Sequence, residues 1–243
     1  MTLPLPPRAD ALLRTSSRKA VAVALNYAAH AAEMQSSLPV PRAAPYWFFK
    51  PSTSYLPPDS GPALLPEFST VHHEVELGVV IGKRATDVPR HLAHKYILGY
   101  ICAIDLTARN WQTQAKEMGR PWSIAKGCDT FLPHSTLVPA DAIPLDKDTG
   151  VADVNLYLDV NGERRQSGST KDMIWTVPEL IEHVSSYVTL EEWDLLLTGT
   201  PEGVSELNHG DVVTAGIQGI VDLKFDVVRK AELRSPDVRA ARQ

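Results

Sequence analysis

The chain has 243 residues, 44% of them hydrophobic and 22% charged, and its 24 basic and 29 acidic residues give a formal net charge of −5 at pH 7. This length is typical of one large domain with a sizeable core. The acidic balance argues against a nucleic acid as the main partner, and no apolar run approaches the roughly 20 residues that a membrane-spanning helix needs. We therefore expect no nucleic-acid partner and no membrane partner.

The cysteines indicate the redox compartment of the protein, and the composition of the chain ends indicates the bounds of the folded domain. Cys102 and Cys128 lack CxxC spacing, which argues against a disulfide framework and a thiolate zinc site and favours a reducing compartment over secretion. Residues 1–19 contain prolines and more basic than acidic side chains, a pattern that predicts a loosely ordered arm or a targeting signal. We expect one folded domain over residues 20–230, followed by a basic tail over residues 231–243.

Apolar runs and turn residues predict more strands than helices. Thr176 and Glu179 have the spacing of a capping box, and Asn161-Gly162 is typical of a two-residue hairpin turn. In chain order, the expected elements are a short helix over 27–35, strands over 74–82 and 98–105, a helix over 107–118, a hairpin over 154–160 and 163–166, a helix over 179–188, and strands over 195–198 and 212–228. Strands and helices do not alternate as they do around a parallel nucleotide-binding sheet. The pattern therefore predicts an α+β fold that is mainly β.

Several common functional motifs are missing from the sequence. It contains no GxGxxG, no GxxxxGK[ST], no GxSxG and no HExxH. These absences argue against a dinucleotide site, a P-loop, a serine-hydrolase elbow and a zincin.

Three acidic residues form the sharpest local pattern. Glu74 and Glu76 are two positions apart in an expected strand, so their carboxylates project from the same face. Asp105 ends another apolar strand and supplies a third carboxylate. Like charges so close together are explained by a bound cation, and oxygen ligands alone favour Mg²⁺, with Mn²⁺ or Ca²⁺ as alternatives. Taken alone, the same pattern also fits a solvated strand face and an Asp that caps a helix.

Two further segments carry candidate chemistry. If residues 27–35 are helical, His30 and Glu33 share a face, and a carboxylate beside an imidazole raises the basicity of the ring. A surface pair explains the same spacing. Thr200 lies in a glycine-containing turn after an apolar strand, where exposed amides and a hydroxyl form a cradle for a carboxylate or simply a loop.

Seven blocks, in order, resemble the fumarylacetoacetate hydrolase family, most closely its short eukaryotic mitochondrial branch of acylpyruvases and oxaloacetate decarboxylases. The blocks are NYAAHAAE (26–33), FFKPST (48–53), HHEVELGVVIGK (72–83), GYICAIDLTARNWQ (99–112), WSIAKGCDTFLP (122–133), VNGERRQSGSTKDMI (160–174) and LTGTPEGV (197–204). The resemblance spans about residues 20–228. One departure is Ala24-Leu25, where the family usually has Gly-Arg.

The resemblance implies a fold, an assembly and a set of functional residues. The fold is a mixed β-sandwich roll with a few short helices, usually a homodimer, with Mg²⁺ (or Mn²⁺) held by the residues at positions 74, 76 and 105. His30, Glu33 and Lys126 match catalytic positions of the family. The expected substrate-binding residues are Lys50, Arg109, Gln112 and Thr200.

The implied chemistry is cleavage next to a 2-oxo acid. A small 2-oxo acid is the expected substrate, and the leading hypothesis is a hydrolase that cleaves a C–C bond in acylpyruvates through a pyruvate enolate, with oxaloacetate decarboxylation as a second reaction. One alternative is an isomerase or decarboxylase of unsaturated 2-oxo dioates, and another is a non-catalytic metal-binding scaffold. The expected location is mitochondrial or cytoplasmic, not secreted.

Overall fold

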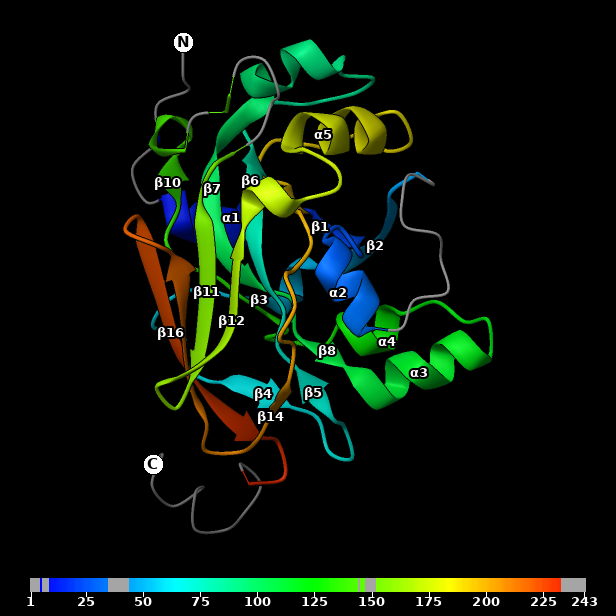
Figure 1. Ribbon diagram of the computed structural model, residues 1–243, viewed down its shortest axis with the longest axis vertical. Coiled ribbons are helices and arrows are strands. Elements are labelled where there is room, and N and C mark those ends of the chain that lie inside the picture. The colour runs from blue at the N-terminus through cyan, green and yellow to red at the C-terminus, as the bar shows by residue number, and fades with distance from the viewer. Residues whose placement is uncertain (1–4, 6–8, 35–43, 144, 147–151, 233–243) are drawn as a thin grey trace.

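The computed structural model describes residues 5, 9–34, 44–143, 145–146 and 152–232. Most of them form two large mixed sheets and two small ones, with a few short helices at the periphery (Figure 1). The predicted α+β, mainly β class is confirmed. Residues 233–243, which hold most of the expected basic tail, lie outside the described part of the chain.

The larger sheet has six strands. Their spatial order is β10 (Val138–Pro139), β7 (Ile97–Ile104), β6 (Val75–Ile81), β13 (Leu195–Leu197), β1 (Lys19–Ala24) and β2 (Tyr46–Pro51). Within it, β1 and β13 are parallel, while β6 is antiparallel to both β7 and β13. Strands distant in sequence are therefore neighbours at the centre of the molecule, where the candidate residues gather.

The second sheet has five strands and packs on the first. Their spatial order is β12 (Glu163–Ser169), β11 (Asn155–Val160), β15 (Val212–Ile217), β16 (Val221–Arg229) and β4 (Ala63–Leu65). A three-stranded sheet contains β14 (Glu206–Leu207), β5 (Val71–His72) and β8 (Thr107–Ala108), and a two-stranded one pairs β3 (Tyr55–Leu56) with β9 (Leu132–Pro133). The predicted hairpin is present as β11 and β12 around Asn161-Gly162, both with positive φ.

The central strands β6, β7 and β13 of the six-stranded sheet are buried on both faces, which explains why all their residues except Glu76 are apolar or glycine. Side chains of β6 alternate, so that Leu77 and Val79 join the core shared with the five-stranded sheet. Val80 joins a second apolar cluster on the other face. That second cluster includes Leu13, which is fully buried.

Leu13 belongs to helix α1 (Ala9–Ser16), and this helix corrects one expectation for the N-terminal arm. The sequence predicts a loosely ordered arm over residues 1–19, but its described part forms a helix and the start of β1. Burial of Leu13 explains the helix, because the second face of the sheet needs an apolar cover. Residues 1–4 and 6–8 lie outside the described part.

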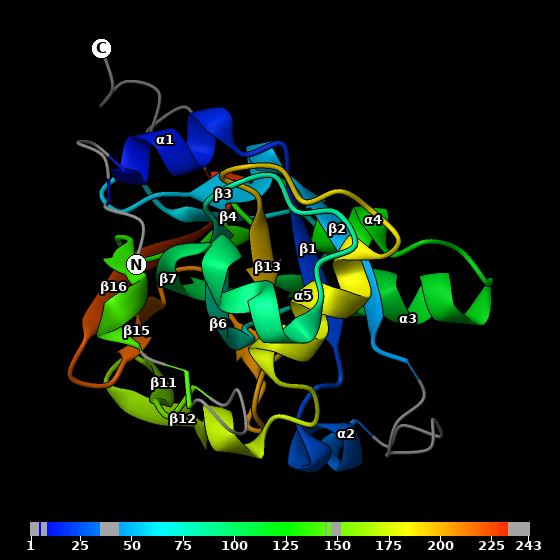
Figure 2. The same cartoon turned by 90° about the horizontal axis from the view of Figure 1, so that it is seen from above.

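The other helices are α2 (Ala28–Glu33), α3 (Arg109–Glu117), α4 (Ser123–Lys126) and α5 (Val177–Ser185). Short 3₁₀ turns cover Ser52–Ser54, Arg90–Tyr96, Ala140–Ala142 and Thr170–Asp172. In Figure 1, α2, α3 and α4 lie on one side of the sheets, and Figure 2 shows α1 and α2 on opposite sides of the central strands. The predicted capping box is present at the start of α5. No helix in the described residues has the length and apolarity to cross a membrane.

Candidate active site

A cavity of about 370 Å³ opens beside the ends of β6, β7 and β13. Its walls come from segments spread over most of the chain, and they divide into a polar and an apolar part. The polar residues are His30, Glu74, Glu76, Asp105, Arg109, Gln112, Lys116, Lys126 and Thr200. The apolar residues are Val23, Ala24, Leu25, Met34, Phe48 and Trp122.

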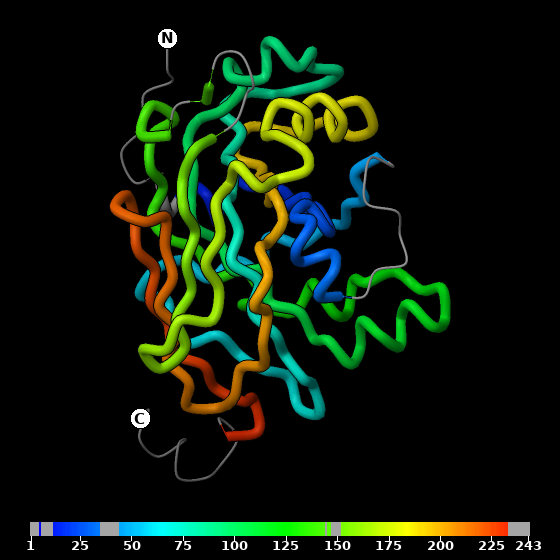
Figure 3. Tube along the Cα trace, viewed as in Figure 1, coloured from blue at the N-terminus to red at the C-terminus, as the bar shows by residue number. Residues whose placement is uncertain are grey.

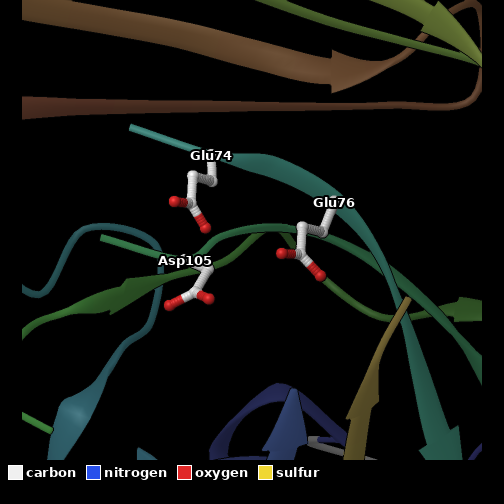
Figure 4. A group of neighbouring side chains, drawn as sticks. All are labelled: Glu74, Glu76 and Asp105. Carbon is white, nitrogen blue, oxygen red and sulfur yellow. The ribbon is translucent and has the colours of Figure 1, made fainter. Parts of the chain in front are cut away.

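The three predicted acidic residues converge at this cavity. Their carboxylate oxygens include a set that lie within 4.8 Å of one another, and all three side chains are buried (Figure 4). The i and i+2 positions put Glu74 and Glu76 on one face of the strand. Asp105 joins them because β6 and β7 are antiparallel with Val75 opposite Ile104, and Asp105 N donates to the backbone oxygen of Glu74 at 2.8 Å.

Basic side chains contact two of the three carboxylates. Lys126 Nζ lies 2.8 Å from Glu74 Oε2 and 2.7 Å from Asp105 Oδ2. Arg109 Nη2 lies 2.5 Å from Glu74 Oε1, and Lys50 Nζ lies 2.7 Å from Asp105 Oδ1. Burial disfavours the charged form of Glu74, but Lys126 and Arg109 outweigh it and hold the pKa of that carboxyl well below its usual range. Burial likewise lowers the pKa of Lys50.

Lys50, which the family resemblance places among the substrate-binding residues, lies outside the lining of the cavity. Its side chain is fully buried, and it is not among the described residues that line the cavity. Besides Asp105, its amine donates to the backbone oxygens of Leu106 (3.2 Å) and Lys126. All three protons of the amine are therefore directed at protein oxygens, and Lys50 holds Asp105 and the start of the following segment in place.

Glu76 differs from its two neighbours because no basic side chain of the described residues forms an ion pair with it. Gly199 N donates to Glu76 Oε2 at 2.6 Å. Burial, together with the nearby charges of Asp105 and Glu74, raises the pKa of Glu76 well above its usual value. The donor set consists of hard oxygens, and one buried carboxylate lacks a cationic partner, so the residues fit a divalent cation of the Mg²⁺ or Mn²⁺ type.

Helix α2 brings the predicted histidine and glutamate together. His30 Nδ1 lies 3.0 Å from Glu33 Oε2, and His30 is buried against the cavity. Glu33 also accepts a hydrogen bond from Gly203 N through Oε1 at 3.0 Å. With Nδ1 engaged by the carboxylate, Nε2 is the nitrogen that remains for proton transfer.

Helices α3 and α4 supply the lysine and arginine side chains that line the cavity. Arg109 and Gln112 line the cavity as predicted, and Arg109 Nη1 donates to Gln112 Oε1 at 2.9 Å. Lys116 lines the same cavity but was missed by sequence reasoning, although its spacing of four from Gln112 and seven from Arg109 is typical of one helix face. Lys126, the last residue of α4, also lines the cavity.

The apolar wall and the buried polar residue Asn26 were also missed. Leu25, Met34, Phe48 and Trp122 come from separate segments, so no local pattern marks them as neighbours. Asn26 is fully buried and ties the segment between β1 and α2 to the residue that follows β13, since its Nδ2 donates to Thr198 O at 2.7 Å. Its position before an expected helix was the only available signal.

Comparisons with known proteins agree over nearly the whole chain. A family model described as fumarylacetoacetate (FAA) hydrolase C-terminal matches residues 19–228. The chain is 47% identical over 215 residues to a mitochondrial oxaloacetate tautomerase of Arabidopsis thaliana, which covers 88% of this chain and 92% of that protein. It is 45% identical over 215 residues to a mitochondrial oxaloacetate decarboxylase of Dictyostelium discoideum, covering 88% of this chain and 95% of that protein.

A solved structure has the same fold. It is the crystal structure of fumarylpyruvate hydrolase from Pseudomonas aeruginosa in complex with Mn²⁺ and pyruvate, with a TM-score of 0.81 and 33% identity over 88% of this chain and 91% of that chain. The predicted family resemblance is thus confirmed by a model that spans most of the chain and by relatives matched over most of their length. The chain belongs to the fumarylacetoacetate hydrolase family.

Proposed function

We propose that the chain is a metal-dependent enzyme of small 2-oxo acids that interconverts the enol and keto forms of oxaloacetate. The observation that carries the proposal is that one cavity is bordered by three carboxylates, the amine of Lys126 and the imidazole of His30, which is paired with Glu33. Such a site combines oxygen ligands with a base for proton transfer at carbon. The tautomerase and decarboxylase relatives support oxaloacetate as the substrate.

The metal would be held by Glu74, Glu76 and Asp105, with Mg²⁺ as the proposed ion and Mn²⁺ as an alternative. When bound, it supplies a Lewis acid that stabilises negative charge on the oxygen of the 2-oxo group. The Mn²⁺ and pyruvate of the fumarylpyruvate hydrolase structure support this class of ion and ligand.

The chain's own residues account for binding and proton movement. His30 Nε2 takes the proton from the enol hydroxyl or from C3 and returns it at the other atom, while Glu33 holds the ring through Nδ1. The amine of Lys126 adds positive charge beside the developing enolate. Arg109, Gln112 and Thr200 are proposed to bind the substrate carboxylates.

Hydrolysis of acylpyruvates is a second candidate, and the apolar wall favours it. Leu25, Met34, Phe48 and Trp122 form a surface suited to an alkyl or aryl acyl group, on the same cavity as His30. In that reaction His30 activates water, the C–C bond breaks at the distal carbonyl, and a carboxylic acid and pyruvate are released. Decarboxylation of oxaloacetate is a third outcome of the same enolate chemistry.

Assembly and location complete the proposal. A homodimer follows from the family resemblance, and size-exclusion chromatography with light scattering tests it. A mitochondrial location is supported by relatives that are named as mitochondrial proteins. Expression of the full chain with a C-terminal fluorescent tag tests the location.

The deciding experiment compares two substrates on purified, EDTA-treated protein with and without added Mg²⁺ or Mn²⁺. Conversion of enol-oxaloacetate is followed by its ultraviolet absorbance against the uncatalysed rate, and acetylpyruvate is assayed in parallel for release of pyruvate and acetate. We expect metal-dependent acceleration of the oxaloacetate reaction that Glu76→Ala abolishes. Faster acetylpyruvate cleavage would favour the hydrolase. A folded, metal-loaded protein that is inert in both assays would support a non-catalytic scaffold.

A further inference from the structure

Gln166 of β12 has a side-chain orientation that the surrounding hydrogen bonds determine. Its side chain is fully buried, and Oε1 lies 3.0 Å from Val75 N and 2.8 Å from His73 Nδ1. A backbone N–H only donates, so the atom facing Val75 is the carbonyl oxygen of the amide. The amide nitrogen therefore faces the opposite way.

That nitrogen donates to the loop after β13. Gln166 Nε2 lies 2.9 Å from Thr200 Oγ1 and 2.9 Å from Pro201 O, which uses both of its protons. Thr200 Oγ1 thus accepts a hydrogen bond from Gln166, so its own hydroxyl proton points toward a different acceptor. Because Thr200 lines the cavity, this proton is available to an anion bound there.

The backbone of β12 supports the same loop. A Cβ at Gly168 would press against the ring of Pro201, and a Cβ at Gly203, where φ is +93°, would clash with the backbone oxygen of Arg165. The trace in Figure 3 follows this loop between β12 and α2. His73 Nε2 lies 2.8 Å from Ser205 Oγ, which ties the far end of the loop to the same network.

The loop also reaches the acidic cluster and the His30–Glu33 pair. Gly199 N donates to Glu76 Oε2, and Gly203 N donates to Glu33 Oε1. Thr200 lies between these two contacts in sequence. A displacement of the loop would therefore move Thr200 and would also disturb the hydrogen bonds to Glu76 and Glu33.

We propose that Gln166 is a positioning residue that makes Thr200 a hydrogen-bond donor to the carboxylate of the bound 2-oxo acid. The inference rests on the proposed function, since it requires an anionic ligand in the cavity. Gln166 does not touch the ligand; it occupies the acceptor side of the threonine hydroxyl, so the donor side is preorganised for the ligand.

A double-mutant cycle tests the inference. Gln166→Met removes the amide at similar volume, Thr200→Val removes the hydroxyl, and Thr200→Ser keeps it. Binding of oxalate to the Mn²⁺-loaded protein is measured by calorimetry, and KM and kcat are measured for oxaloacetate. A lost hydrogen bond to a charged group predicts that Thr200→Val raises the Kd of oxalate about 10-fold to 100-fold.

If Gln166 acts through Thr200, Gln166→Met raises the Kd about 5-fold or more, and the double variant binds no worse than Thr200→Val within about 2-fold. Thr200→Ser should bind nearly as the wild type, and KM should change more than kcat in Gln166→Met. Additive losses in the double variant, or wild-type Kd and KM in Gln166→Met, would overturn the inference.

A control separates this effect from a general loss of stability. Ser185 is an equally buried polar residue whose Oγ accepts from Val88 N at 2.9 Å, and it does not line the cavity. Ser185→Ala should lower the melting temperature and leave the Kd of oxalate unchanged. An equal rise in Kd for Ser185→Ala and Gln166→Met would also refute the inference. Wild-type protein that neither binds oxalate nor converts oxaloacetate would instead refute the proposed function.

Discussion

The buried amine of Lys50 lies 2.7 Å from Asp105 Oδ1, outside the set of described residues that line the cavity. The two side chains come from β2 and from the end of β7, which are separated in the sheet by β6, β13 and β1. The ion pair therefore joins distant strands at the floor of the site. This geometry favours a supporting role for Lys50 over direct contact with the substrate.

Lys50→Met should destabilise the fold, because removing one partner of a buried ion pair leaves Asp105 uncompensated. We expect a loss of about 3 kcal/mol or more in the free energy of unfolding, measured by urea denaturation of the metal-free protein. Lys224 is exposed, so Lys224→Met is a matched control with little expected effect. Unchanged stability with a raised KM for oxaloacetate would instead support the expected role of Lys50 in substrate binding.

Glu76→Gln replaces the carboxyl group of Glu76 by a neutral amide and keeps the shape of the side chain. In the metal-free protein we expect equal or higher thermal stability, because a carboxyl whose charged form is disfavoured by burial and by Asp105 and Glu74 is replaced by a neutral amide. Wild-type protein at Mg²⁺ about 100-fold above Kd should gain about 2.7 kcal/mol, and the variant should gain nothing. Thermal unfolding in EDTA and in MgCl₂ measures both effects.

The control for Glu76→Gln is Glu206→Gln, which removes an exposed carboxylate on β14. It should keep the Mg²⁺-dependent gain in melting temperature. An equal Mg²⁺-dependent gain in Glu76→Gln would show that Glu76 is not a ligand.

His30→Ala should impair the reactions that need proton transfer more than the one that does not. We expect tautomerisation of oxaloacetate and hydrolysis of acetylpyruvate to fall about 100-fold to 10,000-fold. Oxaloacetate decarboxylation should fall less, since loss of CO₂ forms the enolate without a base. Steady-state kcat/KM for the three reactions measures the difference.

Glu33→Gln is the companion variant, because the amide keeps the shape of the side chain and loses its charge. It should reduce the same two reactions, by less than His30→Ala, since the imidazole remains in place. Equal losses in all three reactions for His30→Ala would contradict the assigned role.

Leu25→Arg should shift substrate preference toward a dicarboxylate. Leu25 lines the cavity with a φ of 57°, and a guanidinium there would face a second carboxylate of the substrate. We expect the ratio of kcat/KM for oxaloacetate over acetylpyruvate to rise about 10-fold, the value of one hydrogen bond to a charged group. Leu25→Met, which stays apolar, should leave the ratio unchanged; a similar shift in both variants would argue against an electrostatic cause.

The sequence by itself determined the local patterns of the site. Glu74 and Glu76 share a strand face because side chains alternate with a period of two, and His30 and Glu33 share a helix face because three residues nearly complete a turn. The structure has both pairs as predicted from these periods. Such spacing depends only on backbone geometry, which a short window of sequence already specifies.

Only the tertiary structure decided which distant residues meet. Asp105 joins Glu74 through the antiparallel register of β6 and β7, Lys50 lies behind Asp105, and Gln166 reaches Thr200 from another sheet. These contacts follow from burying both faces of the central strands β6, β7 and β13, a condition that involves the whole chain at once. No local period encodes that condition, which is why α1 and the apolar wall of the cavity were not anticipated.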